Sequence, residues 1–189
     1  WPKSLDDLSS GARAERYKPK PYQQESINDA VTAFDHLDRG QLIMACGTGK
    51  TLVGLWIDEK LKSETTLVLF PSLLLLSKTL AEWVRHSKET FSFLPVCSDE
   101  SVSKPTDDAI QVTTSDLSFP STTSIEEIVQ FLESPGKKVI FSTYQSSPQI
   151  AAAYQSAELK PIDLIICDEA HRCAGRPGSH YTTALQDDQ

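Results

Sequence analysis

One segment constrains the fold of this chain more than any other: residues 44–51, with the sequence MACGTGKT. An apolar run at 41–45 predicts a short strand before it, and the pattern of 50–61 predicts a helix after it. At such a junction, glycines let successive backbone N–H groups point at phosphate oxygens, beside the positive end of the helix. The sequence therefore predicts a phosphate-binding loop, although Met44 replaces the first glycine of the general GxxxxGK(S/T) pattern. The residues expected to hold a nucleotide are Gly47, Thr48, Gly49, Lys50 and Thr51, with the Thr51 hydroxyl also a ligand of Mg²⁺.

Helical and continuously apolar segments alternate along the chain. Strands that are apolar throughout and separated by helices indicate a parallel sheet covered on both faces. We therefore expect one α/β domain over 21–189, a three-layer parallel sheet of the P-loop NTPase kind, after an arm or linker at 1–20. The expected helices are 22–35, 50–61, 72–86, 125–133 and 147–156, and the expected strands are 41–45, 66–70, 92–97, 138–142 and 164–167.

Two adjacent carboxylates, Asp168 and Glu169, follow the predicted strand at 164–167. In an open parallel sheet, ligands bind where the carboxyl ends of the strands open out. Together with the glycine loop, this placement indicates that Asp168 holds Mg²⁺. It also indicates that Glu169 orients and deprotonates the water that attacks the γ-phosphate. Without the loop, an Asp-Glu pair at a strand end would be an ordinary solvated terminus.

These two motifs resemble those of superfamily 2 helicases. The glycine loop is similar to their motif I, and residues 168–171 read DEAH, a form of their motif II. The resemblance implies a RecA-like domain that uses ATP and Mg²⁺. It also implies that His171 joins Lys50, Asp168 and Glu169 in the catalytic set and links hydrolysis to movement, with Arg172 as a candidate partner.

The segment 21–24, with the sequence PYQQ, is similar to the glutamine element that precedes the first helix in this family. There a glutamine reads the edge of adenine, to which an amide can both donate and accept hydrogen bonds. By position that role falls to Gln23, with Gln24 as the alternative. On its own, such a segment would be an ordinary helix surface.

Two further strand ends resemble the motifs with which the family grips nucleic-acid backbone. Pro71 and Ser72 follow the strand at 66–70, and Thr143 and Tyr144 follow the strand at 138–142. Small hydroxyls and helix N-termini bind phosphates without sequence preference. Simple capping and turn roles explain Ser72 and Thr143 about as well.

Within the superfamily, the strings PYQQESI, MACGTGKT, FSTYQSS and DEAHRC resemble the restriction-enzyme branch most, the motors of type I and related systems. The resemblance covers residues 21–172 and implies duplex DNA and a second RecA-like domain of the same parent chain as partners. Because an arginine of that second domain completes such a site, we expect this piece alone to bind nucleotide weakly and hydrolyse it poorly. The alternatives are an ATP-gated nucleic-acid sensor or switch, and a scaffold that has lost catalysis. The intact catalytic residues argue against the scaffold.

The formal net charge of −8 neither excludes nor favours nucleic acid. Residues 99–133 contain eight acidic side chains and one lysine, so they carry −7 of that charge and leave the remainder near neutral. We expect this segment to be a surface insertion away from the DNA track.

The four cysteines form no CxxC pair and are expected to be free thiols in a reducing cytoplasm. A zinc site from Cys167, His171, Cys173 and His180 is the alternative, but its spacing fits no standard site. No apolar stretch is long enough to span a membrane.

Overall fold

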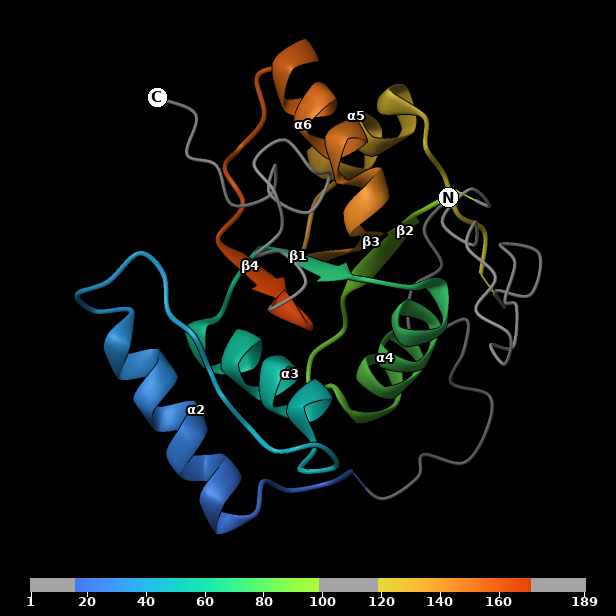
Figure 1. Ribbon diagram of the computed structural model, residues 1–189. Helices are drawn as coiled ribbons and strands as arrows, with labels where there is room; N and C mark the ends of the chain where they lie inside the picture. Colours follow the sequence, from blue (N-terminus) through green and yellow to red (C-terminus); the bar gives the residue numbers. More distant parts are fainter. Residues whose placement is uncertain (1–15, 99–118, 171–189) are drawn as a thin grey trace.

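A computed structural model of the 189-residue chain describes residues 16–98 and 119–170. In these ranges the centre of the molecule is a sheet of four parallel strands, in the spatial order β2-β3-β1-β4 (Figure 1). Strand β1 therefore lies between β3 and β4, its neighbours on either side. The strands are β1 (Thr65–Phe70), β2 (Ser92–Val96), β3 (Lys138–Thr143) and β4 (Leu164–Cys167).

Helices cover both faces of this sheet (Figure 1). On one face lie α3 (Lys50–Leu61) and α4 (Leu73–His86), with α2 (Pro21–Ala33) packed against the outer side of α3. The other face is covered by α5 (Ile125–Glu133) and α6 (Ser147–Ser156), which follows the short 3₁₀ helix η3 (Tyr144–Ser146). The predicted three-layer α/β fold is confirmed.

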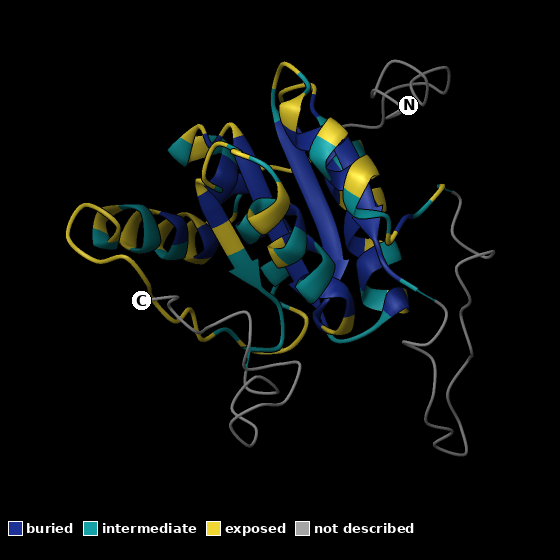
Figure 2. Ribbon diagram, turned by 90° about the horizontal axis from the view of Figure 1, so that it is seen from above, coloured by how far each residue is buried: buried dark blue, intermediate teal, exposed yellow. Residues whose placement is uncertain are grey.

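The inner strands are buried on both faces, which explains why their sequences are apolar throughout rather than alternating. In β1, Val68 and Phe70 belong to the core on the α3 and α4 side, whereas Leu67 and Leu69 belong to the core on the α5 and α6 side. Figure 2 shows these inner strands dark blue from end to end. On the outer strand β4, Ile165 is 47% exposed.

The predicted strand at 41–45 is wrong. The structure places this segment outside the sheet, where Leu42 is 43% exposed and Ile43 is 84% exposed. A strand needs a neighbour for its backbone N–H and C=O groups, and β4 pairs only with β1 among the residues that the structure describes. An apolar run of five residues is compatible with a strand but does not by itself supply that neighbour.

The other predicted elements are present, with ends that differ by one or two residues. Residues 16–20 belong to neither a helix nor a strand, and α2 begins at Pro21, a proline that suits the first turn of a helix. The first half of the acidic segment, residues 99–118, lies outside the described residues, while its last part forms α5. Within 16–98 and 119–170, no helix has the length and apolar character needed to cross a membrane.

The strand register brings the functional segments to one edge of the sheet. Phe70, at the end of β1, lies beside Thr143 at the end of β3, and Leu69 lies beside Cys167 at the end of β4. The chain segments that leave these three strands therefore emerge side by side, at the carboxyl ends. Helix α3 also begins near this edge, because Gly54 in its second turn packs against Ile166 of β4.

Candidate nucleotide-binding site

The glycine loop turns sharply before α3. The N–H of Thr48 donates to the carbonyl oxygen of Ala45 at 3.4 Å, and the Thr48 hydroxyl donates to the same oxygen at 2.7 Å. Gly47 and Gly49 have φ angles of +75° and +82°, which side chains other than glycine rarely adopt. The two glycines therefore supply the backbone freedom that the sequence pattern predicts for a loop of this kind.

The amide of Gln23 fastens this loop to α2. Its Nε2 donates to the carbonyl oxygen of Thr48 at 2.8 Å, and its Oε1 accepts from the N–H of Lys20 at 2.8 Å. Gln23 is only 6% exposed, and a Cβ on Gly49 would lie 2.6 Å from its Nε2. The structure thus places Gln23 beside the loop, where its hydrogen bonds stabilise the loop conformation. The contact of Gln23 with adenine stays a prediction, and Gln24 is exposed and donates to Asn28.

The first turn of α3 faces the acidic pair at the end of β4. The Nζ of Lys50 lies 3.8 Å from Oε1 of Glu169, and the two side chains are 36% and 31% exposed. Thr51 is half-buried in the same turn, and its carbonyl oxygen accepts a hydrogen bond from the indole Nε1 of Trp83 at 3.0 Å. Two motifs more than a hundred residues apart in the sequence therefore form one site.

Burial raises the pKa of the Asp168 carboxyl, and the charge of Glu169 raises it further. The N–H of Glu169 and the charge of Lys50 lower the same pKa, but they do not outweigh the first two effects. The two neighbouring carboxylates thus repel each other, and the charge of Lys50 offsets the effect of this repulsion on Asp168 only in part. Carboxylate and hydroxyl oxygens are the ligands that Mg²⁺ prefers, so Asp168 and Thr51 fit the predicted metal. The described residues include no cluster of three or more His, Cys, Asp or Glu side chains arranged for a metal ion.

Glu169 adopts a left-handed backbone conformation, with a φ of +53°. For a residue with a side chain this conformation costs on the order of 1–2 kcal/mol, so the surroundings must hold it. The N–H of Glu169 donates to Oδ1 of Asp168 at 3.0 Å, and the N–H of Asp168 donates to the carbonyl oxygen of Leu69 at 2.9 Å. His171 and Arg172, which complete the predicted DEAH motif, lie outside the described residues.

The predicted nucleic-acid contacts lie at the same edge but differ in exposure. Pro71 and Ser72 are half-buried, and the Ser72 hydroxyl caps α4 by accepting from the N–H of Leu75 at 3.4 Å. Thr143 is 1% exposed and Tyr144 is 0% exposed. The Thr143 hydroxyl donates to Ser146, so its side chain is engaged inside the protein. Contacts of these four residues with nucleic acid stay a prediction.

Tyr144 has an internal role that the sequence pattern does not indicate. The Tyr144 hydroxyl donates to the carbonyl oxygen of Asp168 at 2.8 Å. Its position directly after a strand, like that of Asp168, was the available signal. The strand order that brings the two residues together was not readable from the sequence.

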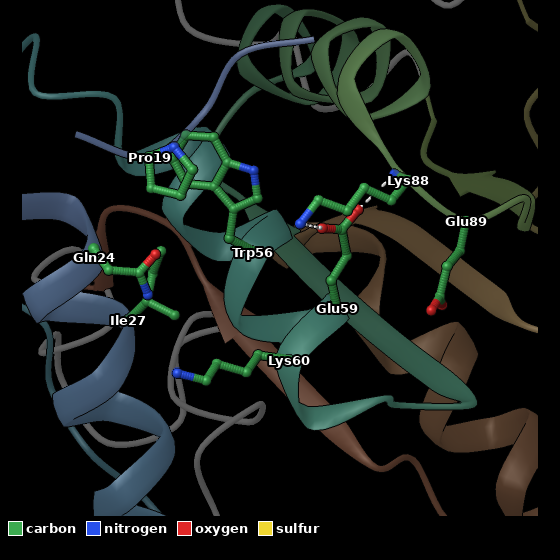
Figure 3. Close-up of a pocket in the computed structure, with 8 residues that line it drawn as sticks. All are labelled: Pro19, Gln24, Ile27, Trp56, Glu59, Lys60, Lys88 and Glu89. Atoms are coloured by element: carbon green, nitrogen blue, oxygen red, sulfur yellow. Dashed lines mark hydrogen bonds and ion pairs between the residues drawn. The ribbon is translucent and has the colours of Figure 1, made fainter. Parts of the chain in front are cut away.

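A separate cavity of about 200 Å³ lies between α2, α3 and the turn that follows α4 (Figure 3). Figure 3 shows Pro19 and Trp56 side by side at one end, and Glu59 paired with Lys88 at the other. Of the residues considered for the nucleotide, only Gln24 lines it. The cavity is also smaller than the 300–1,000 Å³ that is usual for ligand pockets, so we do not assign the nucleotide to it.

Solved structures that this chain resembles include those of two restriction enzymes. One is described as "ATP-dependent Type ISP restriction-modification enzyme LlaBIII bound to DNA"; the TM-score is 0.78 and the identity 34%, over 91% of this chain and 12% of that chain. The other is a nuclease-deletion mutant of the Type ISP enzyme LlaGI in complex with a DNA substrate mimic; the TM-score is 0.67 and the identity 36%, over 82% of this chain and 15% of that chain. The fold and the site define a RecA-like domain of the helicase class.

The family follows from the sequence comparison. The model described as "Type III restriction enzyme, res subunit" matches residues 16–187, and the chain belongs to this family. A search of the curated proteins found no match. The chain spans only 12% and 15% of the length of the two solved enzymes.

Proposed function

We propose that this chain is the ATP-binding half of a DNA-dependent ATPase that translocates along duplex DNA as part of a restriction system. The observation that carries the proposal is the 3.8 Å approach of Lys50 Nζ to Glu169 Oε1 at the carboxyl edge of the sheet. It joins the glycine loop, a Walker A motif, to the acidic pair of a DEAH box. The family supports a restriction system, and the Type ISP enzymes, one bound to DNA and one in complex with a DNA substrate mimic, support DNA as the partner.

Each residue of the site has a proposed role. Lys50 binds the β- and γ-phosphates, while backbone N–H groups of Gly47, Thr48 and Gly49 surround them. Thr51 and Asp168 hold Mg²⁺, which neutralises phosphate charge when it is bound. Glu169 orients the attacking water and accepts its proton on a carboxylate oxygen. His171 links hydrolysis to movement, and Gln23 contacts adenine from its position beside the loop.

Nucleic acid is proposed to lie along the carboxyl edge, near Pro71 and Ser72. Because Thr143 and Tyr144 are buried as whole residues, backbone included, a contact of nucleic acid with either of them would require the turn after β3 to open. A second RecA-like domain of the parent chain would close the nucleotide cleft and supply an arginine for the developing charge. Turnover by this piece alone at about one per second, within the ordinary enzyme range, would contradict that requirement.

The test is the steady-state ATPase activity of the full-length parent protein. It is measured without nucleic acid and with duplex DNA, single-stranded DNA and RNA, and Lys50→Ala serves as the blank. Stimulation by duplex DNA that is absent in Lys50→Ala supports the proposal. Hydrolysis that no nucleic acid changes would refute the motor and favour the alternative, an ATP-gated sensor or switch.

A further inference from the structure

Tyr144 connects the end of β3 to the acidic pair after β4. It is the first residue of η3 and is 0% exposed, and its ring packs in the core on the α5 and α6 side. From there its hydroxyl donates to the carbonyl oxygen of Asp168 at 2.8 Å. Because β1 lies between β3 and β4, this hydrogen bond passes across the carboxyl end of the intervening strand.

That hydrogen bond fixes one end of the peptide group between Asp168 and Glu169. At the other end of the same peptide group, the N–H of Glu169 donates to Oδ1 of Asp168 at 3.0 Å. The preceding N–H, that of Asp168, donates to Leu69 on β1. The plane of a peptide group is rigid, so its orientation sets the φ of the residue that follows. The +53° of Glu169 is therefore held by hydrogen bonds on both sides of this one peptide group.

We propose that Tyr144 is a positioning residue for ATP hydrolysis. Its hydroxyl keeps the peptide group in the orientation that turns the Glu169 carboxylate toward Lys50 and the glycine loop. Without this hydroxyl, only the hydrogen bond from the N–H of Glu169 to Asp168 holds the peptide group, and Glu169 relaxes from its left-handed conformation toward the common ones. The inference rests on the proposed function, because it takes Glu169 as the residue that activates water.

A purely structural role is the competing explanation, since a buried tyrosine hydroxyl usually finds an acceptor. The chain offers a matched control for it. The hydroxyl of Tyr154, on α6, donates to the carbonyl oxygen of Lys160 at 3.0 Å. Tyr154→Phe removes the same kind of hydrogen bond without touching the acidic pair.

The experiment compares Tyr144→Phe with Tyr154→Phe in the full-length parent protein. Three quantities are measured: the kcat and KM for ATP with duplex DNA, the melting temperature, and hydrogen exchange of the amides at 168 and 169. For Tyr144→Phe we expect kcat to fall about tenfold, which equals about 1.4 kcal/mol in the barrier. We expect KM within about twofold, because the phosphate-binding residues are unchanged. The two amides should exchange faster, whereas Tyr154→Phe should leave both kcat and exchange unchanged.

Several results would overturn the proposal. An unchanged kcat in Tyr144→Phe would do so, and so would a kcat loss that Tyr154→Phe reproduces in proportion to its lower melting temperature. Unchanged exchange at 168 and 169 would show that the hydroxyl does not hold the peptide group. If the parent protein shows no hydrolysis that Lys50→Ala abolishes, the proposed function fails by itself. The exchange measurement then still decides whether Tyr144 holds this turn.

Discussion

Asp58-Glu59 on α3 and Asp168-Glu169 after β4 are both adjacent acidic pairs with a lysine close by, and the structure surrounds them differently. Asp58 is 1% exposed, accepts from the hydroxyl of Thr66, and lies 2.7 Å from Nζ of Lys137. Glu59 accepts from the N–H of Lys88 at 2.6 Å. The first pair thus has its partners within the protein, at the opposite end of α3 from the glycine loop.

The second pair is more exposed, and its two carboxylates repel each other. Glu169 is 31% exposed and lies 3.8 Å from Lys50, beyond hydrogen-bond range. Asp168 has a raised pKa, caused first by burial and then by the charge of Glu169. The comparison teaches that an acidic pair is a candidate for chemistry when it is partly exposed and repulsion within it raises the pKa of a carboxyl. The same dipeptide is a structural feature when the fold has already balanced its charge.

The largest expected effect separates the two glutamates. Glu169→Gln in the parent protein should lower the kcat of ATP hydrolysis by about 100- to 10,000-fold, because an amide cannot accept the proton of the attacking water. The matched change, Glu59→Gln, should leave kcat within about twofold, since its amide oxygen can still accept from the N–H of Lys88. Steady-state hydrolysis with duplex DNA measures both, and nucleotide binding confirms that each variant is loaded. Equal losses in the two variants would remove the distinction between the pairs.

The next largest effect is on the free energy of unfolding, and it distinguishes Lys137, beside the first pair, from Lys50, beside the second. Lys137 is 12% exposed, and Lys137→Met would leave Asp58 as a buried charge without its counter-ion. We expect the free energy of unfolding to fall by about 3–5 kcal/mol. Lys50→Met, at a lysine that is 36% exposed, should change it by no more than about 0.5 kcal/mol. Denaturant unfolding of both variants is the measurement. A large loss in Lys50→Met would mean that its ion pair with Glu169 is structural.

A smaller effect tests how Gln23 stabilises the glycine loop, which faces Asp168 and Glu169. Gly49→Ala places a Cβ 2.6 Å from Gln23 Nε2, at a φ of +82°. Gly136→Ala meets a similar φ of +89° but no atom within 4 Å. Both variants should lose about 1–2 kcal/mol to backbone strain. Gly49→Ala should lose about 1 kcal/mol more of its free energy of unfolding, because the added Cβ displaces Gln23 from its hydrogen bond with the loop. Its affinity for nucleotide should fall as well. Calorimetric unfolding and nucleotide titration measure this, and equal losses in the two variants would show that Gln23 does not brace the loop.

The fold was predictable because its strands are buried on both faces and alternate with helices. The sequence showed that pattern directly in β1 and β3, and the parallel sheet followed from it. The segment 41–45 carried the same local signal, but whether a strand forms there depends on a neighbour far away in sequence. Local patterns identify segments that can pair, and the tertiary structure decides which of them do.

The residues of the site could be predicted from the sequence, but the hydrogen bonds that hold them in place could not. Lys50 and Glu169 could be expected to meet, because both follow strand-type segments toward one edge of a parallel sheet. The hydrogen bonds of Gln23 with the loop and of Tyr144 with Asp168 could not. They depend on the packing of α2 against α3 and on the strand order, which no local pattern specifies.

The smallest expected effect is a change in stability that has opposite signs when Asp168 and Asp58 are replaced. The pKa of Asp168 in the folded protein lies above its ordinary value of 3.8, so between the two values the folded state holds more protons than the unfolded state. Stability therefore falls as the pH rises through this window and stays reduced above it.

Asp168→Asn removes that cost, and the side chain is only half-buried, so we expect a gain of no more than about 0.5 kcal/mol at pH 7. The gain should disappear below pH 3.8, where Asp168 is protonated in both states. Asp58→Asn should act in the opposite direction at pH 7, because it removes the nearer of two carboxylates that pair with Lys137, at 2.7 Å, and leaves only that of Glu89 at 3.5 Å. Thermal unfolding between pH 3 and pH 8 gives both curves. If Asp168→Asn lowers stability at pH 7 as Asp58→Asn does, then the fold stabilises the Asp168 carboxylate as it stabilises that of Asp58, and the two acidic pairs do not differ in the way that their pKa values and exposure indicate.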